Sequence, residues 1–198
     1  MSLSPKHIGI LLFDQAELLD FAGPFEVFSS INIALKNKAG DSPHVFSIAE
    51  TTDPITSANG MKVVPDYTFD DHPQIDLLIL PGGNGTKEVI RDDKLMGTIL
   101  NLIRDASVVL SVCTGARILA KPGFLKDKTV TTHKSASGDI LALEPDCRVD
   151  LSLRFADNGK FITAGGVSAG IDASLYLCEK FWGAEVRKSV AEYIEWPD

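Results

Sequence analysis

Cys113 is the residue whose type and position most clearly suggest chemistry. It lies in the segment SVVLSVCTGARILA (107–120), where an apolar run passes directly into a helical stretch. A side chain on such a sharp strand-to-helix turn has its tip above the sheet, as in the nucleophile elbows of serine hydrolases. The positive end of a helix dipole would lower the pKa of a thiol there and favour the reactive thiolate. We therefore predict a nucleophile at position 113, against the alternative of a buried structural cysteine.

A carboxyl group near Cys113 could supply and remove protons. Asp20 follows the first apolar run and begins a helical stretch, so it either caps that helix or points into the cleft beside the cysteine. Asp14, Glu17 and Glu26 are the competing carboxylates. We expect Asp14 and Glu17 to face solvent, and Glu26 to be exposed, as charged side chains usually are.

Further candidates are a histidine and a pair of glycines. His133 ends the segment TVTTH (129–133), and a cysteine with a histidine is the usual nucleophile–base pair, although a structural histidine is equally compatible. Gly82-Gly83 ends an apolar run, where glycines let backbone N–H groups face an anion or simply form a tight turn. No cysteine or histidine pair has zinc-ligand spacing, and no nucleotide-binding glycine motif occurs. We expect neither a metal nor a cofactor.

The elements that must position these residues alternate between short apolar runs and helical spacing. We predict strands at 7–13, 44–50, 76–83, 107–112 and 129–133. We predict helices at 18–40, 86–104 (one or two), 113–120, 134–143 and 168–196 with a break at Gly183, and turns at 59–60 and 157–159. This order predicts an α/β fold with a parallel-rich central sheet sandwiched by helices. Ligands bind at the carboxyl ends of the strands in such sheets, which is where Cys113 and Gly82-Gly83 would lie.

Composition limits the classes of function. The 198 residues are expected to form a single domain over 1–198. A net charge of −8 and the lack of any basic run argue against nucleic acid and against anionic membranes as partners. The apolar run near the start is too short for a signal peptide or a membrane span. Three cysteines need no disulfide scaffold, so we expect a reduced, cytoplasmic setting.

Five segments, taken in order, resemble the DJ-1/PfpI superfamily over about residues 6–182: LLFDQAELLDFAGPFEVF, LLILPGG, SVCTGARILA, TVTTH and GGVSAGID. Within the superfamily, LD-x-x-GP followed by SVCTG is most similar to the isocyanide hydratase branch. The same module forms the ligand-binding half of some AraC-type regulators. The resemblance implies a flavodoxin-like, class I glutamine amidotransferase-like fold, and usually a homodimer.

The resemblance also implies roles for individual residues. Cys113 would be the nucleophile, and Asp20 the acid that hydrogen-bonds its sulfur. The anion-binding pocket would be formed at the Gly82-Gly83 turn, by the Gly83 N–H together with the backbone and side chain of Thr114. His133 matches the position of a pocket histidine in many relatives.

Three departures refine the resemblance. Lys134 follows His133 where the hydratase branch tends to have an aromatic residue. Thr114 occupies the histidine position of the PfpI peptidase-like branch, which argues against peptidase activity. No helix-turn-helix segment follows the family core, so we do not expect a DNA-binding regulator.

Three functions remain open from the sequence. One is a cofactor-free hydratase that converts an isocyanide, a small electrophile, to an N-formamide through Cys113. Another is a glyoxalase-III-like lyase that acts on methylglyoxal, which His133 favours, whereas Thr114 and Asp20 favour the hydratase. A third is a redox or stress sensor without catalytic activity, because an accessible low-pKa cysteine oxidises readily.

Overall fold

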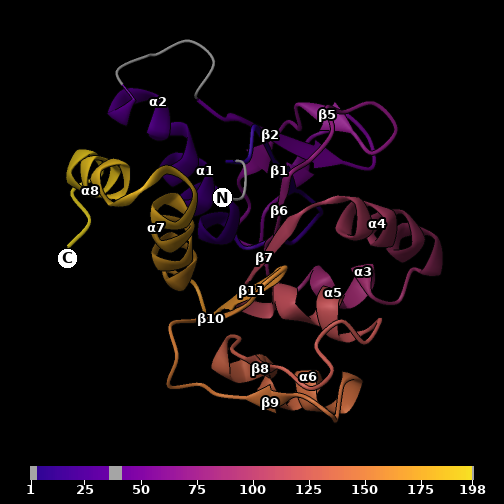
Figure 1. The fold of residues 1–198 in the computed structure, drawn as a ribbon. Coiled ribbons are helices and arrows are strands. Elements are labelled where there is room, and N and C mark those ends of the chain that lie inside the picture. Colours follow the sequence, from indigo (N-terminus) through magenta and orange to yellow (C-terminus); the bar gives the residue numbers. More distant parts are fainter. Residues whose placement is uncertain (1–3, 36–41, 198) are drawn as a thin grey trace.

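The computed structural model describes residues 4–35 and 42–197, and its centre is a seven-stranded sheet with the order β10-β11-β7-β6-β1-β2-β5 (Figure 1). The strands are β1 (His7–Leu11), β2 (His44–Ala49), β5 (Tyr67–Thr68), β6 (Leu77–Leu80), β7 (Val108–Val112), β10 (Phe155–Asn158) and β11 (Phe161–Ala164). Neighbouring strands are parallel except for the β10–β11 hairpin. The predicted parallel-rich α/β fold is confirmed.

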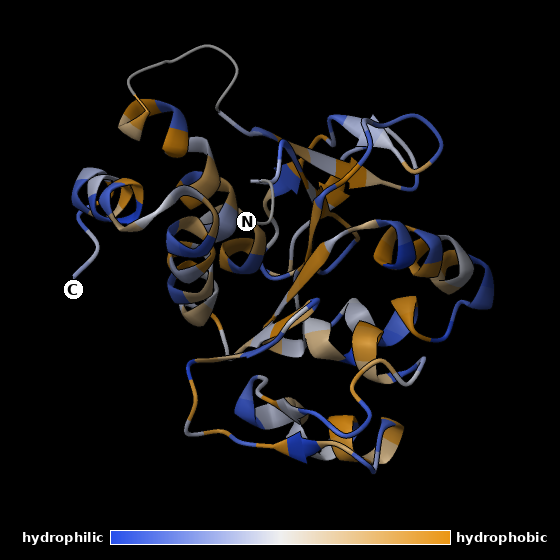
Figure 2. Cartoon of the chain, in the orientation of Figure 1, coloured by the Kyte–Doolittle hydropathy of each residue, from blue (hydrophilic) through white to orange (hydrophobic). Residues whose placement is uncertain are grey.

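Helices cover both faces of the sheet, as Figure 1 shows. On one face lie α1 (Leu18–Ser29), α2 (Ile31–Ala34), α7 (Ala169–Trp182) and α8 (Ala184–Tyr193). On the other lie α3 (Thr86–Val89), α4 (Asp93–Asp105), α5 (Ala116–Ala120) and α6 (Ser137–Leu143). The strands between these layers are the most continuously hydrophobic part of the ribbon in Figure 2.

Strand β6 explains why the apolar runs form this sheet. Its sequence is LLIL, and all four side chains are fully buried. Successive side chains of a strand point to opposite faces. Accordingly Leu77 and Ile79 belong to the core beneath α1 and α7, while Leu78 and Leu80 belong to the core beneath α4 and α5. A strand with two buried faces needs this unbroken apolar run.

The helix predicted over 18–40 is shorter than its pattern suggests. It ends at Ser29, and α2 follows after Ser30. The Ser29 hydroxyl donates to the Phe25 carbonyl at 2.6 Å, which is the kind of side-chain bond that competes with regular helix. The predicted stop at Gly40 lies outside the described residues. The prediction over 86–104 resolves into two helices because the Asp92 side chain caps α4 by accepting the Leu95 N–H.

The segment 129–133 differs from its prediction in a way that matters for the site. Only Thr129–Val130 is a strand, β8, and it pairs with β9 (Arg148–Val149) in a separate two-stranded sheet. His133 precedes a short 3₁₀ turn, Lys134–Ala136, and so lies on a loop rather than at the end of a central strand. The turns at 59–60 and 157–159 do join antiparallel strands, the former linking β3 (Ile55–Thr56) to β4 (Lys62–Val63).

Candidate active site

The sharp strand-to-helix turn predicted at Cys113 is present, and its backbone is strained. The residue follows β7, opens the 3₁₀ turn Cys113–Gly115 and has a φ of 56°, a left-handed conformation that side chains other than glycine rarely adopt. The Cys113 amide donates to the Gly165 carbonyl at 3.0 Å, and the Cys113 carbonyl accepts from the Thr132 hydroxyl at 2.7 Å. Both backbone groups are thus held by neighbouring loops, which offsets a strain of about 1–3 kcal/mol.

Gly115 allows this turn to pack against the end of β6. A Cβ at position 115 would lie 2.2 Å from the Leu80 carbonyl oxygen and 2.9 Å from that of Pro81. Both obstacles are backbone atoms, so neither can rotate away. The sequence requires glycine here because two chain segments meet without room for a side chain.

We expect Gly115→Ala to destabilise the fold by about 2 kcal/mol or more, since the backbone around the elbow must shift. The measurement is the free energy of unfolding in urea. Gly97→Ala is the matched control, because an added Cβ in the middle of α4 meets no atom within 4 Å and removes a helix-weakening glycine. Equal stability of wild type and Gly115→Ala would contradict the packing described here.

Asp20 lies in the first turn of α1 with no exposed surface. It does not cap the helix: its Oδ2 accepts the Gly82 N–H at 2.9 Å, and its buried Oδ1 has no well-formed hydrogen bond. The Cys113 side chain lies near enough to act on the Asp20 pKa as a side-chain hydrogen bond does. Because Oδ1 has no hydrogen-bond partner among the described residues, it is able to take up a proton.

Burial is the main influence on the Asp20 carboxyl and raises its pKa to about 7. The Gly82 N–H and the Cys113 side chain lower the pKa by favouring the charged form, while the nearby Glu17 charge raises it. Of the competing carboxylates, Asp14 and Glu26 are exposed as expected. Glu17 is half-buried and accepts a hydrogen bond from Asn59 at 3.2 Å.

The thiol of Cys113 does not have the lowered pKa expected from its sequence position. Burial, and next the negative charge of Asp20, raise its pKa to about 12, while the Thr114 N–H lowers it. Only 6% of the residue is exposed, and the following helix α5 has five residues. Desolvation and the neighbouring carboxylate therefore outweigh the short helix. The expectation of a lowered thiol pKa at Cys113 is wrong.

The two groups are best treated as a pair that shares a proton. Near neutral pH the pair can hold one proton, which rests mainly on the Cys113 sulfur while Asp20 is charged. If the proton moves to Asp20, the carboxylate charge that raises the Cys113 pKa disappears. A reactive thiolate is therefore reached by proton transfer within the pair.

The backbone amides of the Gly82-Gly83 turn bind protein groups instead of facing an open anion pocket. The Gly82 N–H donates to Asp20, and the Gly83 N–H donates to the Thr114 hydroxyl at 2.8 Å. Neither amide is free to bind an anion, and the Thr114 side chain is tied to the turn. The Thr114 N–H differs from these two amides because it forms a hydrogen bond with the Cys113 sulfur, which lowers the pKa of the thiol. The expected anion pocket is thus reduced to the Thr114 amide.

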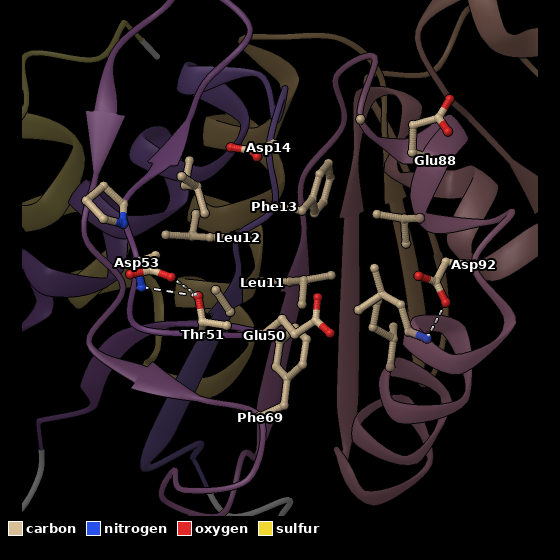
Figure 3. Close-up of a pocket in the computed structure, with 17 residues that line it drawn as sticks. Leu11, Leu12, Phe13, Asp14, Glu50, Thr51, Asp53, Phe69, Glu88 and Asp92 are labelled. Carbon is tan, nitrogen blue, oxygen red and sulfur yellow. Dashed lines mark hydrogen bonds between the residues drawn. The ribbon is translucent and has the colours of Figure 1, made fainter.

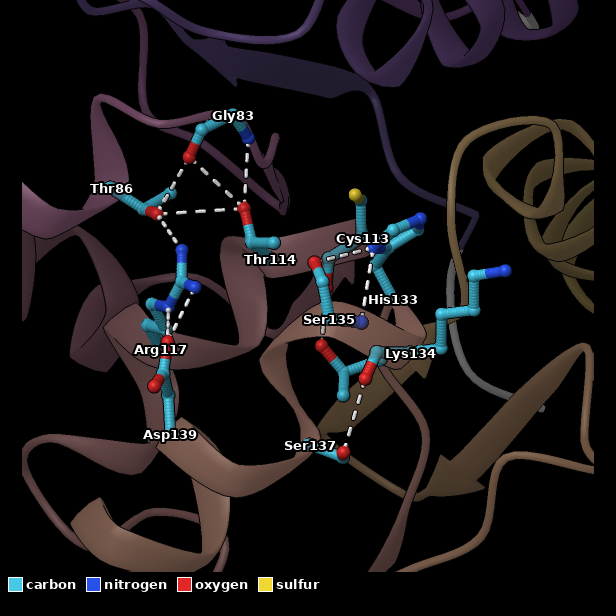
Figure 4. Close-up of polar contacts among 11 residues, drawn as sticks. Gly83, Thr86, Cys113, Thr114, Arg117, His133, Lys134, Ser135, Ser137 and Asp139 are labelled. Carbon is cyan, nitrogen blue, oxygen red and sulfur yellow. Dashed lines mark hydrogen bonds and ion pairs between the residues drawn. The ribbon is translucent and has the colours of Figure 1, made fainter.

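His133 lies beside Cys113, as Figure 4 shows, but its ring has other partners. The backbone N–H of His133 lies 3.5 Å from the Cys113 carbonyl oxygen. The Nδ1 atom of the ring lies 2.7 Å from the Ser135 hydroxyl. A Cβ on Gly166 would lie 2.3 Å from the His133 ring, so the glycine gives the ring its place. The ring helps to line a pocket of about 290 Å³ that also includes Arg154.

A larger pocket, of about 430 Å³, lies at the carboxyl ends of β1 and β2 (Figure 3). Its floor is apolar, and five carboxylate side chains surround it: Asp14, Glu50, Asp53, Glu88 and Asp92. None of the predicted site residues lines this pocket. Two of the carboxylates make structural hydrogen bonds: Asp92 caps α4, and Asp14 accepts the Thr56 N–H at 2.7 Å.

Three polar residues next to the elbow were missed from the sequence. Arg117 is buried, donates to Asp139 through Nε at 2.9 Å, and donates to the Thr86 hydroxyl through a terminal nitrogen at the same distance (Figure 4). A charged residue inside the apolar run ARILA was the available signal. Its partners come from α3 and α6 and share no pattern in the sequence.

Two absences hold within residues 4–35 and 42–197. No group of three or more histidine, cysteine, aspartate or glutamate side chains there is arranged to hold a metal ion. No helix in those ranges has the length and apolar character needed to cross a bilayer.

Comparisons with known proteins agree with the fold and the motifs. The isonitrile hydratase of Pseudomonas putida is 31% identical over 190 residues, which cover 96% of this chain and 78% of the relative. Protein DJ-1alpha of Drosophila melanogaster is 26% identical, with 73% of this chain and 67% of the relative covered. A solved ThiJ/PfpI family structure from Pseudomonas syringae superposes with a TM-score of 0.84 at 25% identity, covering 99% of this chain and 77% of the other. The DJ-1/PfpI family model matches residues 6–180, and the chain belongs to that family.

Proposed function

We propose that this protein is a cofactor-free, cysteine-dependent enzyme that hydrates an isocyanide to an N-formamide. The observation that carries the proposal is the buried Asp20 carboxyl, with a pKa of about 7, beside a thiol on a strained elbow. A group with a pKa near the working pH can both give and take a proton in one cycle. Similarity to an isonitrile hydratase over nearly the whole chain supports the choice of substrate.

The reaction starts from the pair with one proton. The proton passes from Cys113 to Asp20, and the thiolate attacks the terminal carbon of the isocyanide. Asp20 returns its proton to that carbon, which yields a thioimidate bound to Cys113. Water then adds across the carbon–nitrogen double bond: Asp20 takes a proton from the attacking water and passes it to the nitrogen. The carbon–sulfur bond breaks, the N-formamide leaves, and the thiol is restored. The Thr114 N–H stabilises negative charge on the sulfur when the thiolate attacks and when it leaves.

A glyoxalase-III-like lyase acting on methylglyoxal is the second candidate. The observation that favours it is the histidine beside the cysteine, because a base is needed to move a proton between two substrate carbons. Relatives named as deglycases are 26% and 32% identical over parts of the chain. In this geometry the His133 ring bonds Ser135 rather than Cys113, so we rank the hydratase first.

The deciding experiment is one substrate panel for wild type and Cys113→Ala: an alkyl isocyanide, methylglyoxal and a chromogenic ester. We expect N-formamide to form with wild type alone, measured by chromatography of the product. Turnover of methylglyoxal without turnover of isocyanide would move the assignment to the lyase. No turnover of any substrate, with Cys113 still oxidised by peroxide, would favour the redox sensor. The homodimer and the cytoplasmic setting stay predictions.

A further inference from the structure

A chain of hydrogen bonds runs from the surface to the turn that holds Asp20. Asp139, half-exposed, accepts two N–H groups from the buried Arg117 guanidinium, at 2.9 and 2.5 Å. Arg117 donates onward to the Thr86 hydroxyl at 2.9 Å. Thr86 donates to the Gly83 carbonyl at 2.8 Å. Figure 4 shows these four residues in succession.

The direction of every bond in this chain follows from Arg117. A guanidinium has only donors, so the Thr86 oxygen must accept from it. The single Thr86 hydroxyl hydrogen is then free for the Gly83 carbonyl at 2.8 Å, in preference to the Thr114 hydroxyl at 3.5 Å. Without Arg117, Thr86 would have no such fixed orientation and could turn its hydroxyl elsewhere.

The Gly83 carbonyl lies in the same tight turn as the Gly82 N–H that binds Asp20, one residue after it. Gly83 has a φ of 110°, and its carbonyl accepts from Thr86 and, at 3.1 Å, from Thr114. A turn held at this carbonyl keeps the preceding Gly82 N–H aimed at Asp20 Oδ2, 2.9 Å away. The structure contains no direct contact between Arg117 and Asp20, so any influence must pass through the turn.

We propose that Arg117 is a positioning residue of the active site: acting through Thr86 and Gly83, it holds the Gly82 N–H on the Asp20 carboxylate and so sets the charge state of the Cys113–Asp20 pair. The proposal rests on the proposed function for its importance in turnover. Its effect on the pair can be measured without any substrate.

Among the described residues, no charged group packed around Asp20 replaces the Gly82 N–H as the contact that stabilises its charged form. Glu17, at the start of α1, and Cys113, on the elbow, are the titratable groups that act on it, and the Gly82-Gly83 turn offers only backbone. Helix α7 packs against α1 through Gly170 and Ile171, and the charged side chain that follows them, Asp172, is paired with Arg154.

The strands beneath α1 also bring no titratable side chain to Asp20. Their titratable side chains, His7 and His44, begin β1 and β2. These are the amino ends of the strands, and the site lies at their carboxyl ends, on the opposite side of the sheet.

The measurement is the rate of Cys113 alkylation by iodoacetamide from pH 5 to pH 10, read by mass spectrometry. The pair loses its first proton near pH 7, so the rise of the rate with pH should become less steep there, and it continues slowly above pH 7 because the Cys113 thiol keeps a pKa of about 12. Losing the Gly82 hydrogen bond destabilises the charged carboxylate and shifts the rise to higher pH. One hydrogen bond corresponds to a shift of roughly half to one pH unit.

Two pairs of variants separate positioning from simple damage. Thr86→Val removes the hydroxyl while keeping the shape, and Thr86→Ser restores it, so we expect the shift in Thr86→Val and its absence in Thr86→Ser. Arg117→Met should also shift the rise, and it should fold because Asp139 is half-exposed and the replacement is apolar. Arg91→Met is the control, since it breaks an exposed arginine–carboxylate pair with Glu88 of the same α3 segment.

The outcomes keep this proposal apart from the proposed function. Folded Thr86→Val and Arg117→Met proteins whose profiles coincide with wild type would overturn it, as would an equal shift in Arg91→Met or Thr86→Ser. If wild type does not turn over isocyanide but the variants show the shift, the proposed function fails and the positioning role stands. If wild type turns over isocyanide and the profiles coincide, the reverse holds.

Discussion

Cys113→Ala is expected to abolish turnover, because in the proposed reaction the Cys113 sulfur forms the bond to the substrate carbon and alanine has no atom that can replace it. The loss should reach the detection limit, as is usual when a covalent nucleophile is removed. Folding should survive, since alanine keeps the two bonds that hold the backbone at position 113, one to the Gly165 carbonyl and one from the Thr132 hydroxyl. The measurement is N-formamide production together with the circular dichroism spectrum and thermal midpoint.

Cys147→Ser is the matched control for Cys113→Ala. Cys147 is also buried but packs with the opposite core, beneath α4 and α6. We expect this variant to keep turnover close to that of wild type. Ordinary turnover by Cys113→Ala would end the nucleophile assignment, whatever the behaviour of Cys147→Ser.

Asp20→Asn is expected to lower turnover by roughly 10²–10⁴-fold, the usual contribution of a positioned proton-transfer group. An asparagine keeps the shape and can still accept the Gly82 N–H, but it cannot exchange a proton with Cys113. The rise in wild-type turnover with pH should be centred near pH 7, where Asp20 titrates, and should be missing from the residual activity of the variant. Unchanged turnover in Asp20→Asn would remove the acid–base role and leave the nucleophile in place.

The same variant should be more stable than wild type at high pH. The pKa of Asp20 is raised from 3.8 to about 7 on folding, so its ionisation favours the unfolded state. Wild type therefore loses stability between about pH 4 and pH 7 and keeps that deficit above pH 7. The deficit is of order 2–4 kcal/mol. Urea unfolding should show Asp20→Asn level with wild type at pH 4 and more stable at pH 8.

Features that depend on local pattern were predictable. The four apolar residues of β6 have to be buried on two faces, and the abrupt change from strand to helix at Cys113 has few possible backbone geometries. The motif order supported Asp20 as the partner of Cys113. The break at Gly183, which has a φ of 94°, follows from a conformation that only glycine adopts freely.

Features that depend on burial and on distant partners needed the tertiary structure. A position at the start of a helix indicates a lowered thiol pKa, yet in the folded chain desolvation and the Asp20 charge raise that of Cys113 to about 12. The sequence likewise could not reveal that the Gly82 and Gly83 amides are already bound, or that Arg117 meets Thr86. Hydrogen bonds and desolvation are set by atoms brought together from separate elements. The sequence itself therefore determined the fold class and the candidate site residues. Only the packed structure decided the pKa of the Cys113 thiol and the hydrogen-bond partners of the site residues.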